Sequence, residues 1–148
     1  MRIYYLRSDA LEYIMTVSDL MTTKPHLIAE HASVLDAATK MQMTGCGILP
    51  VGKYEKIVGV ITDRDIITRV IAEGKDYNKT TVKNAMSRNI FICFESDSLK
   101  KAVHKMRQHR TRRILVLNKD EKLTGILSVT DIIRRIKDKA ILAILFAE

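Results

Sequence analysis

Two short segments of this 148-residue chain place a glycine, a hydroxyl side chain and an aspartate at the same spacing. They are Gly59-x-x-Thr62-x-x-Asp65 and Gly125-x-x-Ser128-x-x-Asp131. A Ser or Thr followed three residues later by an acid, ahead of an apolar run, is the capping box that begins many helices. Taken singly, each segment predicts a helix start.

The same arrangement also suits a sugar phosphate as ligand. A carboxylate accepts paired hydrogen bonds from ribose hydroxyls, as it does in dinucleotide sites. A hydroxyl and the free backbone N–H groups of a helix N-terminus favour phosphate oxygens. The glycine in front would let such a ligand approach the backbone. One helix end can therefore serve as both a cap and a binding site.

No pattern typical of an enzyme active site accompanies these motifs. The chain contains no nucleophile elbow, P-loop, HExxH helix or Cys/His arrangement. Asp63 and Asp65 are the nearest paired carboxylates, but residues two apart on a helix point to different faces. Arg64 between them further favours a cap. We expect no catalytic residue and no enzymatic activity.

Metal-binding spacings are missing from the sequence as well. Cys46 and Cys93 form no CxxC pair, and small buried hydrophobes are the expected role for both. His104 and His109 are five residues apart without an acidic companion. We expect no metal site and no obligatory cofactor.

The two motifs belong to an internal duplication. Val17, Met21, Ser33, Ala37, Met41 and Val51 recur at one constant offset as Val82, Met86, Ser98, Ala102, Met106 and Val116. The motif from Gly59 recurs from Gly125 at an offset that is longer by a single residue, which is inserted in a turn. A duplication fixes the architecture more firmly than local propensity does.

Both copies show the same order of elements. In the second copy the pattern predicts strands at 90–94, 114–117 and 123–127, a helix over 99–106 and another helix from 129. The first copy fills these positions with 27–28, 48–51 and 57–61 as strands and 33–43 and 63–73 as helices. Each copy is predicted to be a β-α-β-β-α unit.

The predicted fold class is therefore α/β (α+β), with two such repeats packed about a pseudo-two-fold axis and clefts where they meet. The expected organisation is a lead-in segment at 1–16, a repeat at 17–75, a linker at 76–81 and a second repeat at 82–136. Residues 137–148 are expected to be a C-terminal helical extension, continuing the last helix from Ile136.

Both copies resemble the cystathionine-β-synthase (CBS) domain, whose signature is Gly-hydrophobic-x-Thr/Ser-x-x-Asp where the third strand enters a helix. The repeat starts at Val17 and Val82 also resemble those of the family, and residues 48–51 resemble its second strand. The resemblance covers about residues 17–136. It identifies the chain as a tandem CBS pair, or Bateman module.

This resemblance implies a regulatory or sensor module that binds AMP, ADP, ATP or a related adenosyl ligand in a cleft between the repeats, and that forms homodimers. S-adenosylmethionine and NAD(H) are further candidate ligands. Carried over residue by residue, the motif aspartates would hold ribose and the motif hydroxyls would lie beside it, which assigns Asp65 and Asp131 with Thr62 and Ser128. Adenine would lie against apolar strand residues, for which the candidates are Leu49, Pro50 and Val51, with Ile114, Leu115 and Val116.

Many family members carry a basic pair before the second strand, aimed at the phosphates. Arg112 and Arg113 occupy this position in the second copy, whereas Gly47 and Ile48 occupy it in the first. Arg110 stands nearby and would join the two arginines on a polyanionic phosphate. We therefore expect one strong site and one weaker or empty site. We also expect an unidentified effector protein to recognise the nucleotide-bound state.

Charge distribution leaves an alternative function open. Residues 1–75 hold nine Lys/Arg and nine Asp/Glu, whereas residues 76–148 hold sixteen and eight, so the second half carries all of the net charge of +8. The alternative is a non-enzymatic basic scaffold that binds nucleic acid or an anionic protein partner. Residues 100–113 form an acid-free basic stretch that could follow a nucleic-acid backbone. This stretch contains no Phe, Tyr or Trp and no recognisable nucleic-acid-binding motif, so sequence-specific readout is not expected.

Composition is that of an ordinary globular protein, with 47% hydrophobic and 28% charged residues. No apolar run approaches the roughly 18 residues that a membrane span needs. The first residues lack the long apolar region of a secretory signal. A cytoplasmic location without membrane contact is the expectation.

Overall fold

The computed structural model describes residues 15–136 and residue 143, and it has a mixed α/β fold. The chain divides into two compact units. Residues 25–90 form one of them, here called the central unit. The described parts of the segments 1–24 and 91–148 together form the other, here called the terminal unit.

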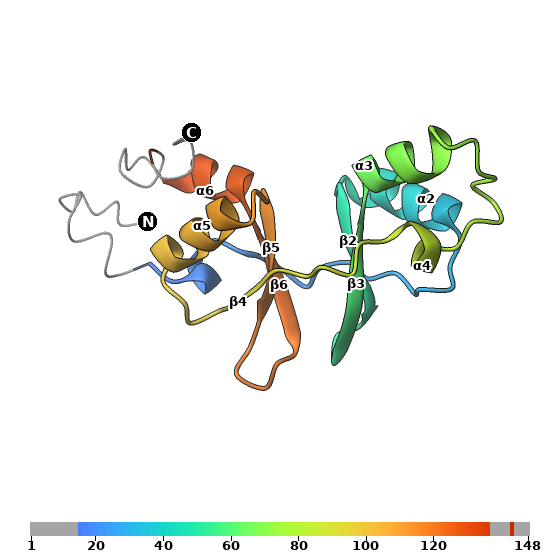
Figure 1. Ribbon diagram of the computed structural model, residues 1–148. Coiled ribbons are helices and arrows are strands. Elements are labelled where there is room, and N and C mark those ends of the chain that lie inside the picture. Colours follow the sequence, from blue (N-terminus) through green and yellow to red (C-terminus); the bar gives the residue numbers. More distant parts are fainter. Residues whose placement is uncertain (1–14, 137–142, 144–148) are drawn as a thin grey trace. The chain divides into compact units, whose positions relative to one another are not determined.

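The central unit is built on an antiparallel pair of strands with helices on one side (Figure 1). Its elements are α2 (Val34–Thr44), β2 (Ile48–Lys53), β3 (Lys56–Thr62), α3 (Asp63–Ile66), the π-helix η2 (Ile67–Ile71) and α4 (Val82–Ala85). Ile28 forms a parallel bridge with Val51, and Ser87 forms an antiparallel bridge with Val60. The pair β2–β3 is thus flanked on both edges by short extended segments.

The terminal unit has a four-stranded sheet in the order β1-β6-β5-β4, with its helices again on one face (Figure 1). Its elements are the 3₁₀-helix η1 (Val17–Asp19), β1 (Thr22–Thr23), β4 (Ile92–Phe94), α5 (Leu99–Gln108), β5 (Arg113–Leu117), β6 (Leu123–Ser128) and α6 (Val129–Arg135). The pair β4–β5 is parallel, and the other pairs are antiparallel.

Each unit has its own apolar core between sheet and helices. In the central unit the core includes Val34, Leu49, Val51, Ile61 and Val70, all with no exposed surface. In the terminal unit Val17, Val103, Val116, Leu127 and Ile132 are equally buried. Burial of a Val, Leu or Ile side chain stabilises a fold by about 1.5–3 kcal/mol, so these two clusters hold the helix ends in place.

A lysine on the long helix of each unit donates a hydrogen bond to the backbone of a neighbouring segment. Lys40 Nζ donates to the Leu27 carbonyl oxygen at 2.6 Å, and Lys105 Nζ donates to the Ile92 carbonyl oxygen at 2.5 Å. Lys40 and Lys105 occupy equivalent positions of the duplication, as do Leu27 and Ile92. These two cations therefore have the same structural role in both repeats.

The compact units and the sequence repeats divide the chain differently. Residues 22–23, at the start of the first repeat, pair with β6 of the terminal unit. Ser87, at the start of the second repeat, pairs with β3 of the central unit. The opening segment of each repeat thus pairs with a strand of the other repeat.

Most predicted elements are found within one to three residues of their expected bounds. Residues 27–28 make only an isolated bridge, at Ile28. The helix predicted over 63–73 consists of α3 and the π-helix η2 and ends at Ile71, because Ala72 N–H bonds back to the Ile67 carbonyl and Gly74 adopts a positive φ of 66°.

The prediction that the last helix continues from Ile136 is wrong at that residue, which is extended and buried in the core. Within the predicted lead-in segment, residues 1–14 lie outside the described residues. So does the predicted C-terminal extension, except for Ala143. No helix in the described part of the chain has the length and apolar character of a membrane span.

Candidate functional site

Both Gly-x-x-Thr/Ser-x-x-Asp motifs form complete capping boxes. Thr62 Oγ1 accepts from Asp65 N–H at 3.1 Å, and Asp65 Oδ2 accepts from Thr62 N–H at 2.9 Å. The equivalent distances at Ser128 and Asp131 are 3.1 Å and 2.9 Å. Both hydroxyls also donate to Oδ2 of the motif aspartate, at 2.8 Å from Thr62 and 2.6 Å from Ser128. One carboxylate oxygen of each aspartate is therefore used by the helix cap itself.

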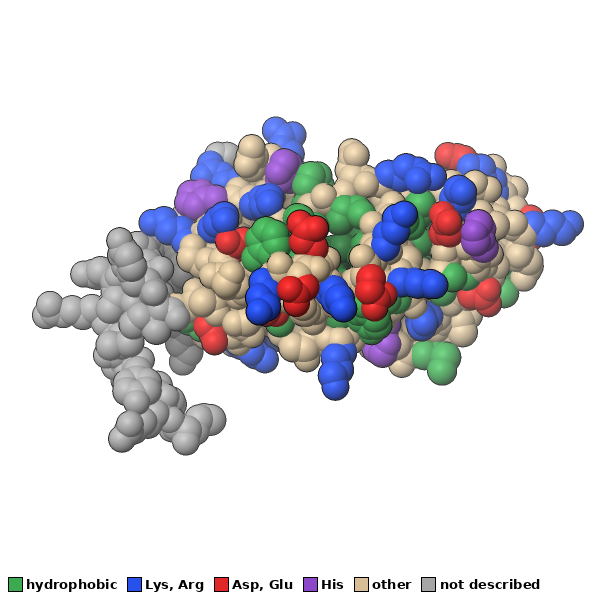
Figure 2. All heavy atoms as spheres, turned by 90° about the horizontal axis from the view of Figure 1, so that it is seen from below, with side chains coloured by type: hydrophobic (Ala, Val, Ile, Leu, Met, Phe, Trp, Pro, Cys, Tyr) green, Lys and Arg blue, Asp and Glu red, His purple; other side chains and the backbone are tan. Residues whose placement is uncertain are grey.

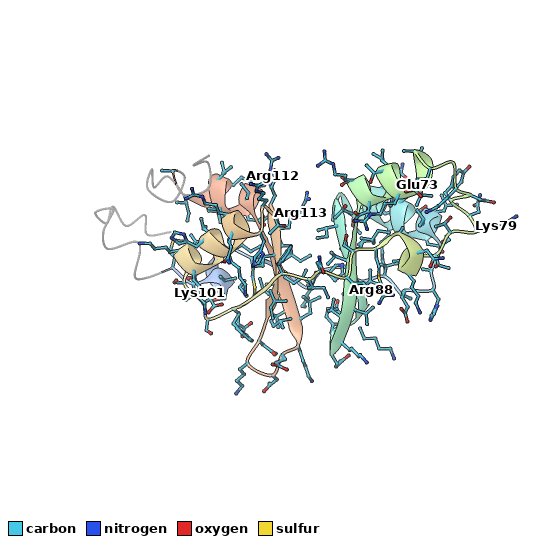
Figure 3. The ribbon with its side chains drawn as sticks, viewed as in Figure 1. Glu73, Lys79, Arg88, Lys101, Arg112 and Arg113 are labelled. Atoms are coloured by element: carbon cyan, nitrogen blue, oxygen red, sulfur yellow. The ribbon has the colours of Figure 1, made fainter. Side chains whose placement is uncertain are left out.

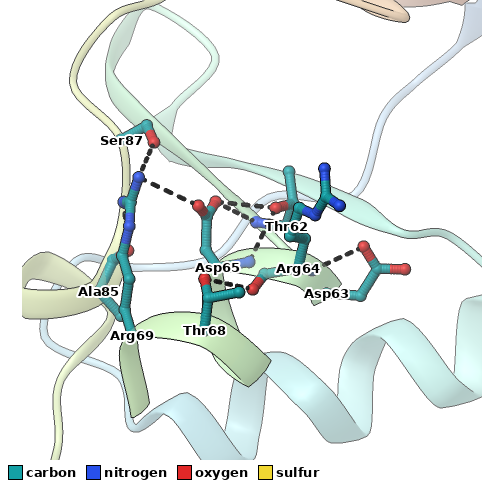
Figure 4. A network of polar contacts seen from close by, with 8 residues as sticks. All are labelled: Thr62, Asp63, Arg64, Asp65, Thr68, Arg69, Ala85 and Ser87. Carbon is teal, nitrogen blue, oxygen red and sulfur yellow. Dashed lines mark hydrogen bonds and ion pairs between the residues drawn. The ribbon is translucent and has the colours of Figure 1, made fainter. Parts of the chain in front are cut away.

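The second oxygen of Asp65 is also occupied. Arg69 Nη2 lies 3.2 Å from Asp65 Oδ1, and the same guanidinium donates to the Ala85 carbonyl oxygen at 2.8 Å and to Ser87 Oγ at 3.0 Å (Figure 4). Asp65 is buried, with 9% of its surface exposed. The first motif therefore ends in a closed network that holds the segment after α4 against its helix.

Asp131 has a different environment. It is half-buried, and its Oδ1 has no hydrogen bond or ion pair with any described residue. Arg135, which follows Asp131 at the same spacing as Arg69 follows Asp65, donates instead to the Asp19 carbonyl oxygen at 2.9 Å. Among the described residues, Asp131 therefore uses only one of its two carboxylate oxygens.

The predicted basic pair lies beside this second motif. Arg113 is the cross-strand partner of Ser128 in the β5–β6 ladder, and the Arg112 carbonyl oxygen accepts from Val129 N–H at 3.0 Å. Both arginines are exposed at the start of β5, close to α6 (Figure 3). The backbone of two exposed arginines in the terminal unit thus adjoins the helix end that carries the motif hydroxyl and carboxylate.

The first motif has no such cations at the equivalent positions. Ile48 is the cross-strand partner of Thr62, and the Gly47 carbonyl oxygen accepts from Asp63 N–H at 3.2 Å. The backbone geometry of the two helix ends is therefore the same, while their charges differ.

The predicted apolar wall residues separate into two sets by strand alternation. Leu49 and Val51, with Ile114 and Val116, face the helices and belong to the two cores. Pro50 and Leu115 are buried too, but neither belongs to these clusters, and strand alternation places them on the opposite sheet face. Contact between any of these residues and adenine stays a prediction.

The motif glycines make room for the chain itself. A Cβ on Gly59 would lie 2.7 Å from Met86 Sδ and 2.8 Å from the Ser87 carbonyl oxygen. A Cβ on Gly125 would lie 2.5 Å from Met21 Sδ and 3.0 Å from the Thr22 carbonyl oxygen. This role differs from the ligand approach expected from the sequence, because the space is filled by the exchanged segments.

Arg69 is the residue that the sequence interpretation overlooked. Its signal was present, since an arginine follows the motif aspartate by four residues in both copies, as Arg69 and Arg135. Residues four apart are neighbours on a helix. No group of three or more His, Cys, Asp or Glu side chains suited to a metal ion occurs among the described residues.

Two small α/β domains, each with a capped Gly-x-x-Thr/Ser-x-x-Asp helix end, define a class of duplicated domain proteins. The CBS domain matches this chain over residues 17–72 and again over residues 82–138. The chain therefore belongs to the CBS domain family and carries a tandem pair of these domains. Such pairs are regulatory modules.

Related proteins agree with this assignment. Hypoxic response protein 1 of Mycobacterium tuberculosis is 30% identical over 127 residues, which cover 85% of this chain and 88% of that protein. The crystal structure of CBSX2 in complex with AMP has a TM-score of 0.66 and 28% identity, and the match covers 80% of this chain and 93% of that one. A hexameric CBS-CP12 protein from bloom-forming cyanobacteria has a TM-score of 0.75 and 26% identity, with 83% and 68% covered.

Proposed function

We propose that this protein is a non-enzymatic regulatory module that binds an adenosine nucleotide at the Ser128–Asp131 helix end of the terminal unit. The proposal is carried by two observations: Asp131 Oδ1 has no partner among the described residues, and the exposed Arg113 is the cross-strand partner of Ser128. A carboxylate oxygen accepts ribose hydroxyls, and guanidinium groups bind phosphate oxygens in paired, charge-assisted hydrogen bonds. The AMP complex of the structural relative CBSX2 supports the choice of ligand class.

The two helix ends are proposed to differ in occupancy. At the first one, Arg69 already neutralises Asp65, and Gly47 and Ile48 supply no charge for phosphates. A ligand there would have to displace an intact ion pair. We therefore propose one principal nucleotide per chain, held by Asp131, Ser128, Arg112 and Arg113 in the terminal unit.

Thermal unfolding of the full chain tests this proposal, with AMP, ADP, ATP, S-adenosylmethionine and NADH added separately. A ligand at 100 times its Kd stabilises a fold by about 2.7 kcal/mol, which raises the Tm by roughly 5–10 °C for a chain of this size. The shift is expected to disappear in Asp131→Ala and to persist in Asp65→Ala. If none of these ligands at millimolar concentration moves the Tm of the wild type, the nucleotide proposal fails.

Regulation by such a module requires that the nucleotide binds two states of the protein with different affinity. The state that it favours would then present a different surface to an effector protein. Scattering and amide hydrogen exchange of the free and nucleotide-bound chain test this step. Identical profiles and identical exchange rates would contradict it.

Self-association is the second part of the proposal. Ile67 and Ile71 of η2 have 60% and 54% of their surfaces exposed, and Ile133 occupies in α6 the position equivalent to Ile67. Exposed apolar side chains that form a contiguous patch mark an interaction surface, whereas single scattered ones do not. The hexameric cyanobacterial relative shows that a CBS-containing protein assembles into oligomers. We propose that these isoleucines contribute to a homodimer interface.

A further inference from the structure

Four arginines gather where α5 ends and its loop leads into β5. Arg107, Arg110, Arg112 and Arg113 are all exposed, and none of their side chains makes a hydrogen bond or ion pair with a described residue. We call these four residues the arginine face. On the surface shown in Figure 2, in contrast, acidic and basic side chains are interspersed. The neighbouring Lys101 and Lys105 have structural partners, in Asp97 and the Ile92 carbonyl oxygen.

The fold itself does not require the arginine face. At the constant offset of the duplication, its members correspond to Gln42, Gly45, Gly47 and Ile48 in the first repeat. These residues carry no charge, yet α2 and β2 form the same helix-to-strand connection as α5 and β5. Something other than stability of the fold therefore accounts for four cations at these positions in one repeat.

Arg110 makes this point most directly. It adopts a left-handed backbone conformation with φ of 50°, which is unfavourable for a residue with a side chain. The equivalent Gly45 has φ of 68° and adopts it without a Cβ penalty. An arginine at a position that favours glycine costs stability, and such strain is concentrated at functional sites.

A stacked ring pair lies at the same end of α5, and its Phe91 packs against the core of the terminal unit. The imidazole of His109, the C-cap residue of α5, stacks on Phe91 with ring centroids 4.2 Å apart and an angle of 18° between the planes. His109 is exposed and Phe91 is half-buried. A flat ring pair beside exposed guanidinium groups is the combination on which unpaired bases stack while their phosphates are bound.

We propose that the arginine face and the His109–Phe91 ring pair bind single-stranded nucleic acid. The arginines hold successive phosphates, and the exposed outer face of the His109 ring stacks against a base, without readout of sequence. The ring pair favours this ligand over an acidic peptide, which would use the cations alone. Arg112 and Arg113 also belong to the proposed nucleotide site, which Arg110 was expected to join. Arg107 and the ring pair do not belong to it, so this inference does not rest on that proposal.

The first repeat supplies the variants that test the inference. Arg107→Gln with Arg110→Gly introduces the residues of the equivalent positions Gln42 and Gly45, so the fold should be kept. Lys53→Gln with Lys56→Gln removes the same charge from an exposed hairpin of the central unit as the matched control. Unfolding of each variant in urea checks that it is folded.

Binding is measured by fluorescence anisotropy of labelled single-stranded RNA and DNA of about 16 nucleotides, with the full chain at several salt concentrations. The arginine variant should bind about tenfold or more weakly, and its log–log salt slope should fall by roughly 1.4, or about 0.7 for each lost phosphate contact. The lysine variant should stay within about twofold of the wild type. His109→Thr introduces the residue of the equivalent position, Thr44. This variant should bind single strands more weakly and bind duplex DNA as the wild type does.

Four results would overturn the inference: no binding by the wild type at low salt, equal weakening in the arginine and lysine variants, duplex DNA bound as tightly as single strands, or stronger competition by polyglutamate than by RNA. Asp131→Ala separates the two proposals. That variant should lose the Tm shift with nucleotide but bind RNA like the wild type.

Discussion

Arg69 Nη2 lies 3.2 Å from Asp65 Oδ1, so the aspartate of the first motif is part of an ion pair inside its own unit. The arginine at the same spacing after Asp131 donates to the carbonyl of Asp19 instead. Two copies of one motif thus perform different tasks. One holds the chain together, and the other leaves a carboxylate oxygen open.

This difference predicts unequal stability losses. Asp65→Ala removes the capping box and leaves the Arg69 guanidinium without its carboxylate, so it should destabilise the fold by about 2 kcal/mol or more. Asp131→Ala removes a capping box alone and should cost about 1 kcal/mol. Urea unfolding of both variants measures the two losses. A double-mutant cycle of Asp65 with Arg69 should show coupling, and equal losses or absent coupling would contradict the proposed network.

The motif glycines predict a second asymmetry. Gly59→Ala would place its Cβ 2.8 Å from the backbone oxygen of Ser87. That oxygen accepts a hydrogen bond from Val60 N–H, so it cannot move away without loss of this bond. Gly125→Ala meets mainly the flexible end of Met21, and the nearest backbone oxygen is 3.0 Å away. We expect Gly59→Ala to cost about 2–3 kcal/mol and Gly125→Ala about 1 kcal/mol. The free energy of unfolding of each variant gives the answer.

Gly74→Ala is the control for conformational strain, because its φ is 66° but no atom lies within 4 Å of the added Cβ. It should cost about 1 kcal/mol through the backbone alone. A larger loss for Gly74→Ala than for Gly59→Ala would show that strain, and not the close approach, is the dominant effect.

The buried thiol predicts a selective chemical reactivity. Burial raises the pKa of Cys93 to about 12, assisted by the nearby negative charge of Asp97. The thiolate is the reactive form, so Cys93 should stay unmodified by a disulfide reagent at neutral pH in the folded protein. Cys46 is half-buried beside the Thr44 hydroxyl and should react first. Mass spectrometry after labelling identifies the modified cysteine.

The same shift has a consequence at high pH. The folded-state pKa of Cys93 lies above its ordinary value of 9.0, so the unfolded chain loses the thiol proton first as the pH rises. Stability should therefore fall between about pH 9 and pH 12. Cys93→Ala should show a weaker fall over this range, and an unchanged pH profile would contradict the assignment.

Asp97 predicts the opposite dependence in acid. Burial raises its pKa, but hydrogen bonds from Lys101 Nζ and Phe94 N–H, together with the charges of Lys101 and Lys105, outweigh burial and hold the pKa below the ordinary value of 3.8. The unfolded state then binds the proton more readily, so this stabilisation is present above pH 3.8 and is lost as the pH falls below it. Asp97→Asn should reduce the slope of unfolding free energy against pH in this acid range.

Much of the fold could be predicted from the sequence because the duplication tests every element twice. Strand and helix patterns that are weak in residues 27–28 are clear in residues 90–94, and the motif marks the start of α3 and α6 alike. The π-helix η2 and the extended Ile136 could not be predicted. Helical spacing does not show where a backbone N–H bonds to the carbonyl five residues back instead of four, or where a helix ends. The pattern within a repeat also gives no sign that residues 22–23 pair with β6.

The two capped helix ends could be predicted from the motif, whereas the tertiary contacts of their side chains could not. Arg113 beside Ser128 follows from strand register, and register follows from the hydrophobic pattern. The link from Arg69 to Ala85 and Ser87 joins parts of the chain 16 and 18 residues apart, which spacing on one helix cannot reveal. A sequence pattern therefore identifies the residues of a motif but does not show which distant residues their side chains contact.

Self-association gives the last prediction. If Ile67 and Ile71 contribute to a homodimer, Ile67→Lys with Ile71→Lys should raise the dimer Kd by about a hundredfold or more, because each isoleucine loses roughly 1.5–3 kcal/mol of apolar burial. Both side chains are exposed in the single chain, so the monomer fold should be kept. Sedimentation velocity over a range of concentrations measures the change. Met43→Lys, at an apolar residue with 81% exposure on α2, controls for the added charge. A wild type that stays monomeric, or a Met43 variant that dissociates equally, would show that η2 is not the dimer surface.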